Sequence, residues 1–250
     1  MTGKTSRKTG KGIPDAGWHN VAHPNRGANM SENEFLPEPL PADPLPMFSR
    51  WFREARARAV QPNPDSMVLA TVSADGAPSA RVVLCKRIDE QAGYIVFFTN
   101  RNSRKGRELD GQQRAAAVFH WDAMHRQVRI EARVVRSPDE ESDAYFASRA
   151  LLSRLSAWAS QQSEPLASRA AFAERLEEEA RRFGIEPGAL DGTVARPPHW
   201  GGYRLWIESL ELWVEGPGRT HDRAVWKRTL TPTGPDTFAT SAWTATRLNP

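Results

Sequence analysis

The strongest constraint on the fold is a series of short, strand-length segments in the first half of the chain, separated by turn residues. Five segments are expected to form strands, covering residues 67–72, 79–86, 94–99, 115–121 and 127–136. The last segment alternates apolar with mainly charged residues, which is typical of a strand with one face in solvent. Residues 95–98 are all apolar, which indicates a strand buried on both faces. Ala74, Asp75 and Gly76 indicate a hairpin turn between the first two strands.

Helices are expected before and after this strand-rich region. Asp43 can cap a helix that has Pro44 at its first position and apolar residues at helical spacing up to Ala59. Further helices are expected over residues 103–109, 138–149, 155–158 and 165–183, and further strands over 203–207, 210–214 and 224–229. Together these elements predict an α+β chain, a single-domain antiparallel β-barrel with peripheral helices.

The net charge of +4 comes from the first 29 residues. Five Lys and Arg residues there accompany one Asp, an excess of 5 − 1 = +4, so the rest of the chain is electrically neutral. We expect residues 1–39 to form a disordered basic tail and residues 40–250 to form the folded domain. The neutrality of residues 30–250 argues against a nucleic-acid partner.

Two further absences narrow the class of protein. Cys85 is the only cysteine, so an intramolecular disulfide is excluded, and no apolar run reaches the roughly 20 residues of a membrane helix. We therefore expect a cytoplasmic protein with no membrane partner. His120 and His125 lack supporting ligands at the spacing of a metal site, so no metal is expected.

Two basic stretches predict a binding site for phosphate. Arg81 and Lys86 lie at the two ends of one expected strand, and side chains five residues apart on a strand point to opposite faces. Ser103 is a good N-cap residue, and Arg104 and Lys105 follow it in the first helical turn. Cations in that turn oppose the helix dipole unless an anion lies among them. The alternative for each stretch alone is a set of solvated surface charges.

Two other clusters have the composition of a binding site. Arg219, His221 and Arg223 are expected to share one face of a strand, and Tyr145, Arg149 and Ser153 are spaced four apart, as on one helix face. An ordinary solvated surface is the alternative for both clusters.

These features occur within motifs whose order resembles one family, the pyridoxine (pyridoxamine) 5′-phosphate oxidases. The resemblance covers residues 40–250 and rests on the combination of motifs rather than on any one of them. The motifs are Leu-Pro-Ala-Asp-Pro-Leu from residue 40, Met-Val-Leu-Ala-Thr-Val from 67, Arg-Val-Val-Leu-Cys-Lys from 81, Phe-Phe-Thr-Asn from 97, Ser-Arg-Lys-Gly from 103, Arg-Gln-Val from 126, Ala-Trp-Ala-Ser-Gln-Gln-Ser from 157, Trp-Gly-Gly-Tyr-Arg from 200 and His-Asp-Arg from 221.

The resemblance implies a split-barrel homodimer that binds FMN at the subunit interface. It implies that Arg81, Arg104 and Lys105 hold the FMN phosphate. Around the flavin it places Val82, Val83, Lys86, Phe98, Thr99, Gln127, Gln162, Ser163, Trp213 and Arg223. It also implies that the substrate phosphate is bound by Lys86, Tyr145, Arg149 and Ser153, with Arg219 and His221 as the catalytic residues at the reacting end.

The implied reaction is the oxidation of pyridoxine 5′-phosphate or pyridoxamine 5′-phosphate to pyridoxal 5′-phosphate. A hydride passes from C4′ of the phosphorylated B6 vitamer to FMN, and O2 then reoxidises the flavin and is released as H2O2. The cofactor carries the redox step, while protein groups position and polarise the substrate. Arg219 is expected to hold the substrate ring over the flavin, and His221 to orient it or relay a proton.

Three departures from the family pattern all concern the substrate side of the site. Ala150, Leu151 and Ser156 stand where the family has a proline, a second arginine and a glycine; residues 30–35 replace an Arg-x-x-Tyr element; and Thr220 replaces a leucine or methionine. A related oxidase of another ring system, such as those of phenazine biosynthesis, is therefore the main alternative. Such enzymes generally lack a lysine at the position of Lys86, so its presence favours the B6 substrate. A non-catalytic flavin- or nucleic-acid-binding module is the third possibility.

Overall fold

The computed structural model describes residues 35–250, so residues 1–34 of the expected basic tail lie outside the described part of the chain. Residues 35–39, which we also assigned to the tail, belong to the folded domain. The side chain of Leu36 is only 4% exposed, and its backbone N–H donates a hydrogen bond to Asp222 at 2.7 Å. Tertiary contacts therefore begin earlier than the first helix.

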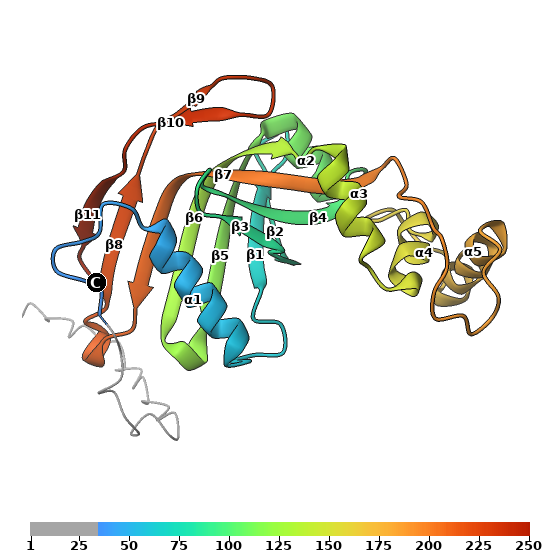
Figure 1. Ribbon diagram of the computed structural model, residues 1–250, viewed down its shortest axis with the longest axis horizontal. Helices are drawn as coiled ribbons and strands as arrows, with labels where there is room; N and C mark the ends of the chain where they lie inside the picture. Colours follow the sequence, from blue (N-terminus) through green and yellow to red (C-terminus); the bar gives the residue numbers. More distant parts are fainter. Residues whose placement is uncertain (1–34) are drawn as a thin grey trace, which may run out of the picture. The chain divides into compact units, whose positions relative to one another are not determined.

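The domain is built on one curled antiparallel sheet (Figure 1). Its main strand order is β11-β8-β7-β6-β5-β1-β2, with β4 paired to β7 and β3 paired to β4. The strands are β1 (Ser66–Val72), β2 (Pro78–Leu84), β3 (Arg87–Asp89), β4 (Tyr94–Asn100), β5 (Arg114–Trp121), β6 (Arg126–Arg136), β7 (Trp200–Val214), β8 (Asp222–Lys227) and β11 (Thr244–Leu248). A separate hairpin joins β9 (Leu230–Pro232) to β10 (Phe238–Thr240). The expected α+β split-barrel class is confirmed.

The longest strand corrects one sequence-based expectation. Residues 203–207 and 210–214, expected as two strands, are parts of the single strand β7. The register between β6 and β7 shifts at Glu131, whose partner is Ser209, while Ala132 pairs with Ile207. Glu208 is thus left outside the ladder with β6, as in a β-bulge, and its carboxylate pairs with Arg114 of β5 and Arg133 of β6. The polar residues Glu208 and Ser209 in the middle of β7 therefore led us to predict two strands where there is one.

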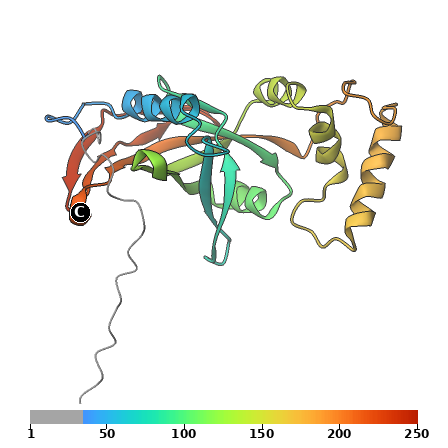
Figure 2. The ribbon, with the colours of Figure 1, turned by 90° about the horizontal axis from the view of Figure 1, so that it is seen from below.

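The first helix closes the core on one face of the sheet (Figure 2). This helix, α1 (Leu45–Ala57), is capped by Asp43, whose carboxylate accepts the N–H of Leu45 at 2.9 Å. Phe48 and Phe52 lie on its buried face, with ring centroids 5.3 and 5.9 Å from that of Phe119 on β5. The expected apolar spacing of this helix is confirmed by these contacts.

The remaining helices lie mostly at the N-terminal end of β7 (Figure 1). They are α2 (Arg104–Gln112), α3 (Asp139–Ala147), α4 (Leu151–Ala159) and α5 (Arg169–Arg182). Helix α5 has no fully buried residue, and its contacts are mainly with α4. Within residues 35–250, none of the helices combines the length and the apolar character needed to cross a membrane.

The contact between α1 and the sheet predicts a large effect of truncating Phe119. The side chain is fully buried, so Phe119→Ala is expected to lower the free energy of unfolding by about 3–5 kcal/mol, measured by urea denaturation. Leu190→Ala is the control, because that side chain is 94% exposed and should change stability by less than about 0.5 kcal/mol. Equal losses in the two variants would contradict this assignment of the core.

Candidate active site

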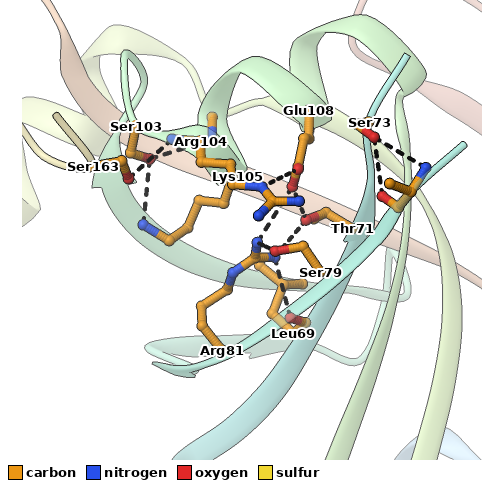
Figure 3. A network of polar contacts seen from close by, with 12 residues as sticks. Leu69, Thr71, Ser73, Ser79, Arg81, Ser103, Arg104, Lys105, Glu108 and Ser163 are labelled. Atoms are coloured by element: carbon orange, nitrogen blue, oxygen red, sulfur yellow. Dashed lines mark hydrogen bonds and ion pairs between the residues drawn. The ribbon is translucent and has the colours of Figure 1, made fainter. Parts of the chain in front are cut away.

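A buried carboxylate gathers the predicted phosphate-binding arginines. Arg104 follows the capping residue Ser103 at the start of α2, and its Nε donates to Glu108 at 2.7 Å. Arg81 reaches the same carboxylate from β2, with Nη2 at 3.3 Å, and Thr71 of β1 also donates to it (Figure 3). Burial raises the pKa of Glu108, but the hydrogen bonds from Thr71 and the arginines outweigh it, and the pKa is lowered overall. Glu108 therefore holds both guanidinium groups in place.

Lys105 is a buried cation beside this cluster. It is 9% exposed, and its Nζ lies 3.2 Å from Thr99 Oγ1, 3.3 Å from Ser103 Oγ and 3.0 Å from Gln162 Oε1. All three partners are neutral oxygens, and no carboxylate among residues 35–250 pairs with this ammonium group. Burial, together with repulsion from Arg81, lowers the pKa of Lys105 to about 8. The site therefore holds more positive charge than its own carboxylate neutralises.

A cavity of about 420 Å³ brings many of the predicted site residues together. Ten of them line it: Val82, Val83, Lys86, Phe98, Thr99, Lys105, Tyr145, Arg149, Ser153 and Gln162. Three more predicted residues lie beside the cavity lining: Arg81, Arg104 and Ser163. The N–H of Arg104 donates to Ser163 Oγ at 3.1 Å, and the charge of Arg81 lowers the pKa of the cavity residue Lys105. Sequence reasoning missed Asn100, Ser160, Phe172 and Trp200, which line the same cavity.

Arg149 is a second cation of the cavity without an anionic partner. Its guanidinium lies over the ring of Trp200, 4.8 Å from the centroid, and 5.7 Å from that of Phe146. Its Nη1 is buried and forms no hydrogen bond within the described part of the chain. Burial lowers the pKa of this guanidinium, with a small opposing effect of Tyr145. An unpaired donor of this kind is ready to bind an anion.

The expectation that Tyr145, Arg149 and Ser153 share one helix face is wrong. Tyr145 is on α3 and Ser153 on α4, while Arg149 lies in the turn between them. Ala150 has extended backbone dihedrals, with ψ at 144°, and this breaks the helical run. The cavity still collects all three side chains, because the turn folds the two helices over the same space.

Stacked aromatic rings form one wall of the cavity. The Phe98 ring is 4.1 Å from that of Tyr145 and 5.6 Å from that of Trp200, with interplanar angles of 13° and 7°. Trp200 begins one of the family motifs, so the sequence could have indicated it as a site residue. Its contact with Arg149 could not be predicted from the sequence. Flat stacked rings of this kind suit an aromatic ligand.

Lys86 and Arg81 have separate partners, as expected from their spacing. Arg81 contacts Glu108, whereas Lys86 lines the cavity and its Nζ pairs with Asp65 at 2.8 Å. Lys86 lies two residues beyond Leu84, the last residue of β2, so it is outside the strand in which we expected it. Asp65, in the loop before β1, carried no signal of its own in the sequence.

The other predicted site residues form a second group at the far end of β7. Gln127, Trp213 and Arg223 are aligned across β6, β7 and β8. The ring of His221 lies 4.6 Å from that of Trp213, and its Nδ1 accepts the N–H of Gly216 at 3.3 Å. This group lines no part of the cavity described above.

The expectation that Arg219, His221 and Arg223 share a strand face is also wrong. The turn that starts at Gly216 continues as a short 3-10 helix to Arg219, and β8 begins only at Asp222. Arg219 has a φ of +66°, in the left-handed region that is strained for a residue with a side chain. Arg219 is thus displayed on a tight loop rather than on the sheet.

The two groups are too far apart along the chain to bind one small ligand. Trp200 lines the cavity and Trp213 belongs to the second group, and both lie on β7. At about 3.3 Å per residue, this separation is roughly 40 Å along the strand. The predicted site residues therefore fall into two groups at opposite ends of β7.

The unpaired charge of Lys105 predicts a pH-dependent effect on stability. Its pKa falls from the ordinary 10.5 to about 8, so between these pH values the unfolded chain binds more protons and stability rises with pH. Lys105→Met is therefore expected to stabilise the ligand-free protein by about 2 kcal/mol at pH 7, and the gain should fade from pH 8 towards pH 10.5. Denaturation curves across this range test the prediction. The exposed Lys227→Met is the control and should show neither effect.

Comparison with known proteins places the chain in a family. Residues 54–181 match the family described as pyridoxamine 5′-phosphate oxidase, and residues 200–250 match the pyridoxine 5′-phosphate oxidase C-terminal dimerisation region. A pyridoxine/pyridoxamine 5′-phosphate oxidase of Burkholderia cenocepacia is 49% identical over 223 residues, which is 89% of this chain and 94% of that protein. One from Cupriavidus necator is 46% identical over 222 residues, covering 89% and 93% of the two chains.

Solved structures agree with this fold. PhzG from Burkholderia lata, in complex with tetrahydrophenazine-1-carboxylic acid, has a TM-score of 0.72 and 29% identity, covering 84% of this chain and 94% of that one. A pyridoxamine 5′-phosphate oxidase-related, FMN-binding protein from Nostoc punctiforme has a TM-score of 0.56 at 17% identity, covering 80% and 97%, and supports the fold alone. The chain belongs to the pyridoxamine 5′-phosphate oxidase family of FMN-dependent oxidoreductases.

Proposed function

We propose that this protein oxidises pyridoxine 5′-phosphate or pyridoxamine 5′-phosphate to pyridoxal 5′-phosphate, with O2 as the acceptor and H2O2 as a product. The observation that carries the proposal is the presence on one cavity of two separate cations, Lys105 and Arg149, that have no anionic partner among residues 35–250. A phosphorylated cofactor and a phosphorylated substrate together need two phosphate sites.

The cofactor end of the cavity fits a phosphate group in charge and in geometry. Arg81, Arg104 and Lys105 carry three positive charges and Glu108 one negative charge, which leaves 3 − 1 = +2. A phosphate monoester carries about −1.5 to −2 at neutral pH. The N-terminus of α2 adds a positive dipole end, with the N–H groups of Arg104 and Gly106 held by Ser163 and Ser103. These residues would hold the FMN phosphate, and bound FMN would supply the hydride acceptor and the reaction with oxygen.

The substrate end fits a phosphorylated aromatic ring. Arg149 offers its unpaired Nη1, and Lys86 uses one of three ammonium donors on Asp65. Tyr145 and Ser153 line the same end with hydroxyl groups, and Tyr145 also belongs to the aromatic wall. We infer that Arg149 and Lys86 fix the substrate phosphate while the stacked rings orient the pyridine.

A second copy of the chain would supply the other partial site. Trp213, Arg219, His221 and Arg223 all lie in the segment that matches the dimerisation region. Because His221 Nδ1 accepts a backbone N–H, its ring proton in this arrangement is on Nε2, which can donate to a substrate. Arg219 would add a guanidinium at the reacting end. The homodimer would thus unite the two groups that one protomer keeps roughly 40 Å apart along β7.

Oxidation of a flat, unphosphorylated ring is the second candidate function. The structural similarity to the Burkholderia lata protein solved with a tetrahydrophenazine carboxylic acid favours it, and so does the stacked wall of Phe98, Tyr145 and Trp200. This reaction would use the same cofactor end but would leave Arg149 and Lys86 without a phosphate to bind.

Oxygen uptake separates the two candidates. We expect the purified holoprotein to consume O2 with pyridoxine or pyridoxamine 5′-phosphate, and Arg149→Ala or Lys86→Ala to raise KM at least about tenfold by removing a charged hydrogen bond. Arg181→Ala, on an exposed face of α5, is the control and should leave KM unchanged. Oxygen uptake with a reduced phenazine carboxylic acid and none with either B6 phosphate would favour the second candidate.

Mixing two inactive variants tests the shared site. Arg149→Ala and Arg219→Ala remove residues from the two separate groups, and each variant alone is expected to lose most of its activity. After co-refolding, heterodimers would contain one intact site, so roughly a quarter of wild-type activity should return. If each site lies within one chain, no activity should return. The control is a mixture of Arg149→Ala with Lys86→Ala, two variants that alter the same group, and it should recover no activity in either case.

A further inference from the structure

Phe172 is an aromatic residue of the cavity that neither the sequence motifs nor the proposed mechanism uses. It lies in the first turn of α5, is half-buried, and lines the same cavity as Lys105 and Gln162. It also lines a smaller adjoining cavity of about 200 Å³ together with Gln162 and Ser163. No aromatic side chain within residues 35–250 stacks on its ring. Because Gln162 contacts Lys105, Phe172 lies at the proposed cofactor end of the site rather than at the substrate end.

The linker before α5 is bound to the predicted phosphate site. Gln162 Oε1 accepts from Lys105 at 3.0 Å, Ser163 Oγ accepts the N–H of Arg104 at 3.1 Å, and Glu164 pairs with Arg107 at 3.0 Å. Ser163 adopts a left-handed φ of +79°, which turns the chain sharply at this point. The position of the start of α5 is thus set by contacts with the residues that would hold the FMN phosphate.

The two ends of α5 are held differently. Its C-terminal half packs on α4 through Leu176, Ala180 and the following Phe183, whose ring is 5.5 Å from that of Trp158. No residue of the helix is fully buried. Its N-terminal half is therefore connected to the domain mainly by the linker and by the side chain of Phe172 at the cavity.

We propose that Phe172 is a cofactor-retaining residue that covers the phosphate end of bound FMN and excludes water from it. This inference rests on the proposed placement of the FMN phosphate among Arg81, Arg104 and Lys105. Ionic and hydrogen-bonding contacts strengthen when water is excluded, because the local dielectric constant falls. An apolar ring over the contacts of Lys105 and Gln162 would slow cofactor release without touching the substrate.

Cofactor affinity of three variants tests this proposal. Phe172→Ala removes the ring, Phe172→Leu keeps most of the apolar volume, and Leu152→Ala removes an apolar side chain, 63% exposed, that lines a different cavity. We expect Phe172→Ala to raise the Kd for FMN about five- to tenfold, measured by flavin fluorescence, through faster release. Phe172→Leu should change it less than threefold and Leu152→Ala not at all.

Hydrogen exchange supplies a readout that does not depend on turnover. Addition of FMN to the wild-type protein should slow amide exchange over residues 160–176, and Phe172→Ala should lose this protection in α5 but keep it at the N-terminus of α2. The inference is overturned if Phe172→Ala has an unchanged Kd for FMN, or if amide exchange in α5 is the same with and without FMN. Neither result would contradict the proposed placement of the FMN phosphate. A wild-type protein that binds no FMN would instead remove the proposed function itself.

Discussion

The buried carboxylate of Glu108 is the interaction on which the candidate site depends. It joins three elements, because Thr71 of β1, Arg81 of β2 and Arg104 of α2 all donate to the same group. Removing one partner from a buried ionic cluster leaves an uncompensated charge, and this typically costs about 3–5 kcal/mol of stability. The edge hairpin and the start of α2 are therefore held at a fixed distance, and the donors between them are aimed before a ligand binds.

The cluster is electrically incomplete without a ligand. Glu108 offsets one positive charge, whereas Lys105 is surrounded by neutral oxygens and Arg149 has an unpaired donor against an aromatic wall. Buried cations without partners destabilise a fold, as the lowered pKa of Lys105 indicates. Bound phosphate would compensate them. The same property that weakens the ligand-free protein would give it affinity and selectivity for phosphorylated molecules.

The length of β7 separates the two groups of predicted site residues. Its N-terminal end supplies Trp200 to the cavity, and its C-terminal end carries Trp213 beside His221. A small domain cannot fold a 15-residue strand back on itself, and the sheet pairs it along its whole length with β6. The two groups of predicted site residues are therefore separated within a chain, and in the proposed homodimer the C-terminal region would bring them together.

The sequence by itself determined strands β1, β2, β4, β5, β6 and β8, the α+β class and the family, because these follow from local periodicity and from contiguous motifs. Ser103 caps α2, and Arg104 and Lys105 lie in its first turn, as predicted, because the capping residue fixes the start of a helix locally. Helix and strand faces that depended on a turn were predicted wrongly, as at Ala150 and at Gly216–Thr220, where the backbone leaves its periodic conformation. Only the tertiary structure revealed Glu108, Asp65 and Phe172 as neighbours of the site, because contacts between residues far apart in the chain leave no local periodicity to read.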